Sequence, residues 1–77
     1  MEVDKIIEGI KNGKHFTIAT SRYEQYLWYK DGKFYSAYED GIHNSSSVEK
    51  TEDYIRTSIQ HALNRPREYD AVFEEDW

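Results

Sequence analysis

The side chains that most often carry chemistry are three histidines and a run of three serines, and none is placed to act. His15, His43 and His61 lie far apart, and no two have the i, i+4 spacing that sets a pair of metal ligands on one helix face. Ser45–Ser47 lacks the flanking glycines that hold a nucleophilic serine on a sharp strand-to-helix turn. The chain has no cysteine to serve as a nucleophile or a thiolate ligand. The sequence therefore predicts no catalytic residue, no metal site and no cofactor.

The carboxylates are the remaining side chains that could carry chemistry. Their excess over basic residues favours a binding function over catalysis. The chain has 15 acidic against 10 basic residues, and residues 49–77 alone carry eight acids and four bases. Catalysis by two carboxylates needs a water-excluding cleft that separates their pKa values, and a chain of 77 residues seldom builds one. An acidic surface repels DNA, RNA and anionic lipid, and it attracts basic protein surfaces. We therefore expect a non-enzymatic protein that binds a protein partner, with no direct contact to nucleic acid or membrane.

The closing segment, REYDAVFEEDW at residues 67–77, sets many of these acids among large side chains. Its apolar positions follow the helical spacing i, i+3, i+4 and i+8 at Tyr69, Val72, Phe73 and Trp77. This spacing predicts a short amphipathic helix with the acids on its wet side. The helix could dock on its own domain or in a partner's groove, and a loose solvated end is the third alternative. The carboxylates that we expect to bind a partner are Glu68, Asp70, Glu74, Glu75 and Asp76.

The first half of the chain predicts a helix and a sheet. Apolar residues spaced from Val3 to Ile10 predict an amphipathic helix over residues 2–12. Alternating and aromatic-rich segments predict three strands, which cover residues 15–20, 25–30 and 33–39. Asp31-Gly32 stands between the last two and predicts a two-residue type I′ hairpin turn, which needs positive φ twice.

The hairpin turn fixes the register, and the register decides which side chains share a face. Trp28 is expected opposite Tyr35, and Tyr26 opposite Ala37. One face then carries Leu27, Tyr29, Phe34 and Tyr38, and the other carries Tyr26, Trp28, Tyr35 and Ala37. Either helices cover one face and Tyr edges merely line the other, or the outer aromatics Tyr26, Trp28 and Tyr35 form a contact surface.

A second helix is expected in the last third of the chain. Ser46 followed by Glu49 matches a capping box, and helical spacing continues to Leu63. Pro66 either ends that helix or begins another, because it cannot donate an interior hydrogen bond. The predicted fold class is therefore α+β in a single domain, residues 1–77. It has an N-terminal helix, a three-stranded antiparallel sheet, a C-terminal helix and a short acidic helix, in the order αβββα(α). The same order occurs in double-stranded RNA-binding domains, but the acids at the start of the second helix argue against that function.

Four segments along most of the chain resemble a family of phage inhibitors. They read VDKIIEGIKNGKHFT, KDGKFYSAYED, SVEK and REYDAVFEED. With these segments the chain resembles small phage anti-CRISPR proteins, especially the type II-A inhibitor that occupies the protospacer-adjacent-motif site of the RNA-guided DNA nuclease. The resemblance implies an acidic DNA mimic, whose carboxylates bind the Arg and Lys side chains that normally read DNA.

The resemblance also implies where the contacts lie. In that family they come from the hairpin turn and from the acids after the last long helix, which match Asp31, Gly32, Glu68, Tyr69 and Asp70. The chain departs from the family after the turn, where Lys33 and Phe34 replace a polar residue and an acid. A lysine has the wrong sign for a DNA-mimicking tip, so the C-terminal acids carry more of the hypothesis.

Two functions follow from these observations. The first is a protein inhibitor that blocks target-DNA binding by a CRISPR effector, acting in the host-cell cytoplasm. The second is a small regulatory adaptor that binds a protein through the aromatic face, with a homodimer as one form. Salt separates them, because screening weakens charge pairing far more than aromatic contact.

Overall fold

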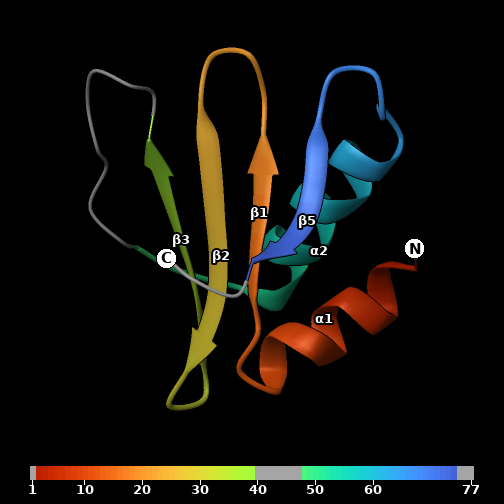
Figure 1. The fold of residues 1–77 in the computed structure, drawn as a ribbon. Coiled ribbons are helices and arrows are strands. Elements are labelled where there is room, and N and C mark those ends of the chain that lie inside the picture. The colour runs from red at the N-terminus through yellow and green to blue at the C-terminus, as the bar shows by residue number, and fades with distance from the viewer. Residues whose placement is uncertain (1, 40–47, 75–77) are drawn as a thin grey trace.

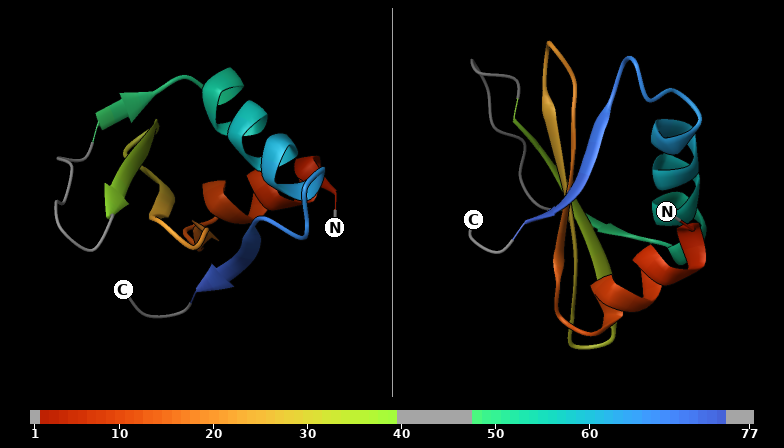
Figure 2. Two further views of the ribbon diagram at one scale, coloured as in Figure 1. Left: turned by 90° about the horizontal axis from the view of Figure 1, so that it is seen from above. Right: turned by 45° about the vertical axis from the view of Figure 1, so that its right-hand side comes forward.

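A computed structural model describes residues 2–39 and 48–74 of the chain. It contains two helices and five strands, in the order α1 (Val3–Lys11), β1 (His15–Ala19), β2 (Glu24–Lys30), β3 (Lys33–Glu39), β4 (Val48–Lys50), α2 (Glu52–Leu63) and β5 (Asp70–Glu74). The strands form one antiparallel sheet in the order β4-β3-β2-β1-β5 (Figure 1). Both helices lie on the same side of this sheet (Figure 2). The fold is thus α+β, but the predicted three-stranded sheet with a terminal helix is wrong.

The larger error concerns the closing segment, in which Asp70–Glu74 forms an edge strand and residues 75–77 lie outside the described residues. Asp70–Glu74 pairs with β1, and Phe16 lies opposite Phe73. The helical spacing was real in the sequence, but so was an alternation that turns Ala71 and Phe73 inward. The strand prevails because an isolated helix this short is marginal in water, whereas pairing satisfies the free edge of β1 and packs a partly buried Phe73 against the core.

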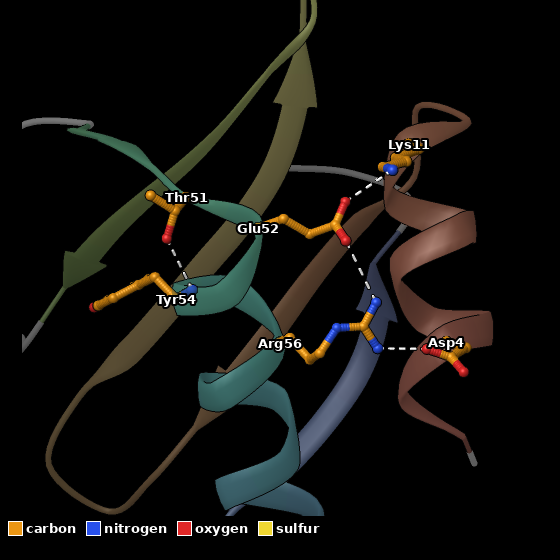
Figure 3. Close-up of polar contacts among 6 residues, drawn as sticks. All are labelled: Asp4, Lys11, Thr51, Glu52, Tyr54 and Arg56. Carbon is orange, nitrogen blue, oxygen red and sulfur yellow. Dashed lines mark hydrogen bonds and ion pairs between the residues drawn. The ribbon is translucent and has the colours of Figure 1, made fainter.

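The second error concerns the start of α2. Val48–Lys50 forms the short strand β4 against β3, so it does not open the helix. The helix begins later, where the Thr51 side chain accepts a hydrogen bond of 3.1 Å from the Tyr54 amide (Figure 3). Thr51 is therefore the N-cap, a role that its hydroxyl suits. The predicted cap, Ser46, lies outside the described residues.

The β2–β3 hairpin is as predicted. Asp31 and Gly32 both have positive φ, 53° and 82°, as a type I′ turn requires. Trp28 lies opposite Tyr35 and Tyr26 opposite Ala37, so the register and the two faces are confirmed. The helix predicted over residues 2–12 is also present, as α1.

The core lies between the sheet and the two helices. Its fully buried large side chains come from both layers: Ile6, Ile10, Phe16, Ile18, Leu27, Ile55 and Ile59. Phe16 meets Phe73 edge to face, with the ring centroids 5.1 Å apart. This contact fastens β5 to the core, so the edge strand is part of the packed domain.

A chain of ion pairs joins the outer sides of the helices (Figure 3). Glu52 of α2 accepts a contact of 2.8 Å from Lys11 of α1, and Arg56 contacts Asp4 and Glu52. The hydrogen bond from Lys11 holds the pKa of the Glu52 carboxyl below its ordinary value. These side chains are all well exposed, so the pairs orient the helices and add little stability.

Neither α1 nor α2, the two helices in the described part of the chain, has the length and apolar character needed to cross a membrane.

Candidate functional site: an acidic and aromatic sheet face

Strand alternation sends one set of side chains away from the helices. Gln25 and Leu27 of β2 are buried beneath the helices, so their neighbours in the strand point to the opposite face. That face is hollowed into a pocket of about 460 Å³. We call it the carboxylate face, and it consists of Thr17, Glu24, Tyr26, Trp28, Tyr35, Ala37, Glu39 and Glu74. It lies on the side of the sheet opposite the helix layer, and its residues come from four strands, β1, β2, β3 and β5.

Two carboxylates of this face confront each other. Glu24 of β2 lies directly opposite Glu39 of β3 in the hairpin register. The Tyr26 hydroxyl lies within 2.5 Å of Glu24 Oε2 and 3.1 Å of Glu39 Oε2. A phenol has one proton, so it donates to one carboxylate at a time. Within the described residues neither carboxylate forms an ion pair. The face therefore holds a like-charge pair that a cation from outside would relieve.

The two carboxylates affect the pKa of the Tyr26 phenol. The hydrogen bond to Glu24, then burial, then the bond to Glu39 raise the pKa of the Tyr26 phenol well above its ordinary value. A raised folded-state pKa means that the neutral phenol stabilises the fold. That stabilisation is complete below the unfolded value of about 10, and it is lost as pH rises through the folded value.

Tyr26→Phe is expected to remove a phenol from the highest-pH part of an alkaline absorbance titration. Part of that step should persist, because burial and the bond to Tyr54 also raise the pKa of Tyr38. The measurement is phenolate absorbance against pH for the two proteins. Tyr35→Phe is the control, because it deletes a phenol from the same face at a position opposite Trp28. Identical high-pH steps in the wild type and Tyr26→Phe would contradict the assigned contacts.

Aromatic rings form the middle of the carboxylate face. Trp28 and Tyr35 are stacked, with ring centroids 5.8 Å apart and an angle of 16° between the planes. Both are half-buried, as is Tyr26. The aromatic surface expected as the alternative site is therefore the same surface as the carboxylate pair. Charge and aromatic contact are properties of one face, and a partner that reaches one reaches both.

The hairpin tip, a predicted contact, carries more positive than negative charge. Asp31 and Gly32 form the turn, but Lys30 lies opposite Lys33 at its base. Lys33 is 3.7 Å from Glu49 of β4, and both side chains are exposed. Two lysines thus flank the single acid, which suits a basic partner poorly.

The remaining predicted acids occupy other places. Glu68 and Asp70 are exposed and share a cleft of about 850 Å³ with Arg22 and Arg67, so opposite charges mix there. Tyr69 packs against the core and lies 3.2 Å from His61. This cleft and the hairpin turn lie at opposite ends of the sheet, so they form no single site (Figure 1).

Only one of the predicted C-terminal acids can be placed on the carboxylate face. Glu74 belongs to that face, where it lines the pocket with Glu24 and Glu39. Glu75 and Asp76 lie outside the described residues. Glu24 and Glu39 were not among the predicted contact residues, although the signal was present in the sequence. The same two-residue turn that pairs Trp28 with Tyr35 also places these two acids opposite each other, on the face of Tyr26.

Within residues 2–39 and 48–74, no three His, Asp or Glu side chains gather closely enough to hold a metal ion. A comparison with known proteins matches the chain to no protein-family model, no curated protein and no solved structure.

Proposed function

We propose that the chain is a non-enzymatic binding protein that occupies a basic, nucleic-acid-binding surface of another protein through its carboxylate face. The observation that carries this proposal is the opposition of Glu24 and Glu39, both within reach of the Tyr26 hydroxyl. Fixed carboxylates in place of phosphates are what a nucleic-acid mimic needs. The Tyr26 hydroxyl also restricts the motion of the two carboxylates, so less side-chain entropy is lost when a partner binds.

The chemistry of the face favours arginine as the group it binds. A guanidinium can pair bidentately with a carboxylate and stack on an aromatic plane, and it keeps its charge in a desolvated contact. Glu24 and Glu39 offer the carboxylates, and the Trp28–Tyr35 stack offers the plane beside them. An incoming cation also removes the repulsion between the two acids, so its binding stabilises the fold as well as the complex.

The resemblance to type II-A anti-CRISPR proteins directs the proposal to a target. The Arg and Lys side chains with which an RNA-guided DNA nuclease reads its target DNA are a surface of the required sign. In this proposal the carboxylate face carries the contacts, together with the C-terminal acids, and the hairpin tip contributes less because of Lys30 and Lys33. The protein would act in the host-cell cytoplasm.

The test is DNA cleavage by a purified guide-loaded nuclease, with this protein added before or after the target DNA. Inhibition only when the protein comes first means that it competes for the DNA site. Glu24→Gln with Glu39→Gln should relieve that inhibition, because the amides keep the shape of the face and lose its charge. Raising the salt concentration should relieve it too. A lack of inhibition across several nuclease types overturns the proposed target.

The second candidate is an adaptor that binds a partner, or a second copy of itself, through Tyr26, Trp28 and Tyr35. The stacked Trp28–Tyr35 pair at the middle of the face favours it, since Trp and Tyr are the commonest interface anchors. Sedimentation at low and high salt separates the two. An aromatic homodimer persists or tightens at high salt, whereas a charge-driven complex dissociates.

A further inference from the structure

A second pocket lies on the other side of the sheet, between the sheet and α2. Its volume is about 260 Å³, and it opens at the end of the helix layer where α2 faces Tyr23 and Tyr38. The lining includes four tyrosines from separate parts of the chain, together with hydroxyl, amide and imidazole groups. No Asp, Glu, Lys or Arg lines it, in a chain with 25 such residues. The pocket is therefore polar without being charged, unlike the carboxylate face.

The side-chain amide of Gln25, which lines the pocket, forms hydrogen bonds with other described residues through its nitrogen but not through its oxygen. Gln25 is only 5% exposed, and its Nε2 lies 3.2 Å from Ser36 Oγ and 3.5 Å from Ser58 Oγ. Its Oε1 forms no hydrogen bond with any described residue. Among the described residues no fully enclosed side-chain polar atom lacks a partner, so Oε1 keeps some exposure, and Gln25 lines the pocket. A ligand or water that enters the pocket can therefore complete the amide, which is costly to leave unsatisfied.

A relay of hydrogen bonds orients a second wall. Arg65 Nη1 lies 3.0 Å from His61 Nδ1, and Arg can only donate. The neutral His61 ring must then carry its proton on Nε2, which donates over 3.2 Å to the Tyr69 oxygen. Tyr69 thereby keeps its own proton for another acceptor. The relay fixes the tautomer of the neutral His61 ring, and both His61 and Tyr69 belong to the pocket lining.

Two aromatic pairs contribute rings to the pocket lining. The Tyr23 and Tyr38 rings meet edge to face at 5.5 Å, and the His61 and Tyr69 rings do so at 5.4 Å. Aromatic rings that also carry hydrogen-bonding groups favour ligands that combine apolar surface with hydrogen-bonding edges. A volume just below the usual range for drug-sized ligands admits one or two fused rings.

From these observations we infer that the pocket between α2 and the sheet binds a small, uncharged heteroaromatic molecule of nucleobase size. The Gln25 amide reads its edge and the tyrosine side chains border its apolar surface. This site is independent of the partner surface proposed above, because the sheet separates the two.

The experiment titrates the full chain with adenine and follows the backbone and side-chain amide resonances by NMR. Benzoate and toluene serve as the charged and the apolar comparison. Adenine at about 1 mM should shift the resonances of the pocket lining, including the Gln25 side-chain amide, which corresponds to weak but specific binding. Binding of benzoate and toluene should be at least about tenfold weaker, since one adds a charge and the other lacks the edge groups.

Three variants test the assignment of the site. Ser58→Leu fills the pocket and should abolish the adenine shifts, with folding checked by the same spectrum. Tyr23→Phe keeps the volume, removes one hydroxyl and should weaken binding several-fold without disturbing the core. Tyr35→Phe, on the carboxylate face, should bind adenine as the wild type does. Toluene binding as well as adenine, shifts that map to the carboxylate face, or no shifts at all would each overturn the inference.

Discussion

Glu39→Lys is expected to strengthen the fold and to weaken partner binding at the same time. The new lysine side chain would lie opposite Glu24, and the like-charge pair would become a cross-strand ion pair worth roughly 0.5–1 kcal/mol of added unfolding free energy. Binding of a basic partner should fall by about tenfold or more, since the face loses a carboxylate and gains a repulsive charge. Urea unfolding and a binding titration on the same preparation measure both effects.

The matched control for Glu39→Lys is Glu8→Lys. Glu8 is exposed on α1, in the helix layer on the other side of the sheet, and the substitution changes the net charge equally. If local contact governs binding, Glu8→Lys should bind almost as well as the wild type. Equal losses for the two variants would mean that only net charge matters. A loss of stability in Glu39→Lys would contradict the repulsion between Glu24 and Glu39.

Phe16→Ala is expected to leave the protein largely unfolded. Phe16 is completely buried, lies opposite Leu27 on β2 and Phe73 on β5, and meets the Phe73 ring edge to face. Removing a buried Phe ring costs about 3–5 kcal/mol, which approaches the entire stability of a domain of this size. Circular dichroism against temperature should show a lost or strongly lowered transition.

Val72→Ala provides the comparison for Phe16→Ala within the same pair of strands. Val72 is 45% exposed and lies opposite Thr17, on the face away from the helices. Its truncation should cost well under about 1 kcal/mol, because little apolar area leaves the core. Similar losses for Val72→Ala and Phe16→Ala would show that β5 pairing, and not burial of Phe16, dominates the stability.

The sequence could predict those features of the fold that depend on residues adjacent in the chain. Asp31-Gly32 dictates its turn locally, and the turn dictates the register, so both hairpin faces followed. The opposition of Glu24 and Glu39 could have been read from the same register. The segment around Phe73 fits a helix and a strand equally well, and the choice depends on the free edge of β1, far away in the sequence.

The pocket between α2 and the sheet lay beyond sequence reasoning for the same reason. Gln25, His61 and Tyr69 look like ordinary surface residues in the sequence, and only the packing of α2 across the strands brings them together. Burial of an amide such as Gln25 is a property of the assembled layers. No residue spacing along the chain predicts this burial.

The pairing of β5 with β1 also sets an order of assembly. The first helix and the β1–β2–β3 strands are consecutive in the chain and can form early, because their contacts close short loops. The strand that pairs with the other side of β1 follows α2 in the chain, and its pairing must close a long loop, so we expect it to form after the hairpins. Until then β1 presents an unpaired edge and Phe16 lacks its partner ring. The half-assembled protein is therefore prone to aggregate at high concentration, and the exposure ends when β5 closes the sheet.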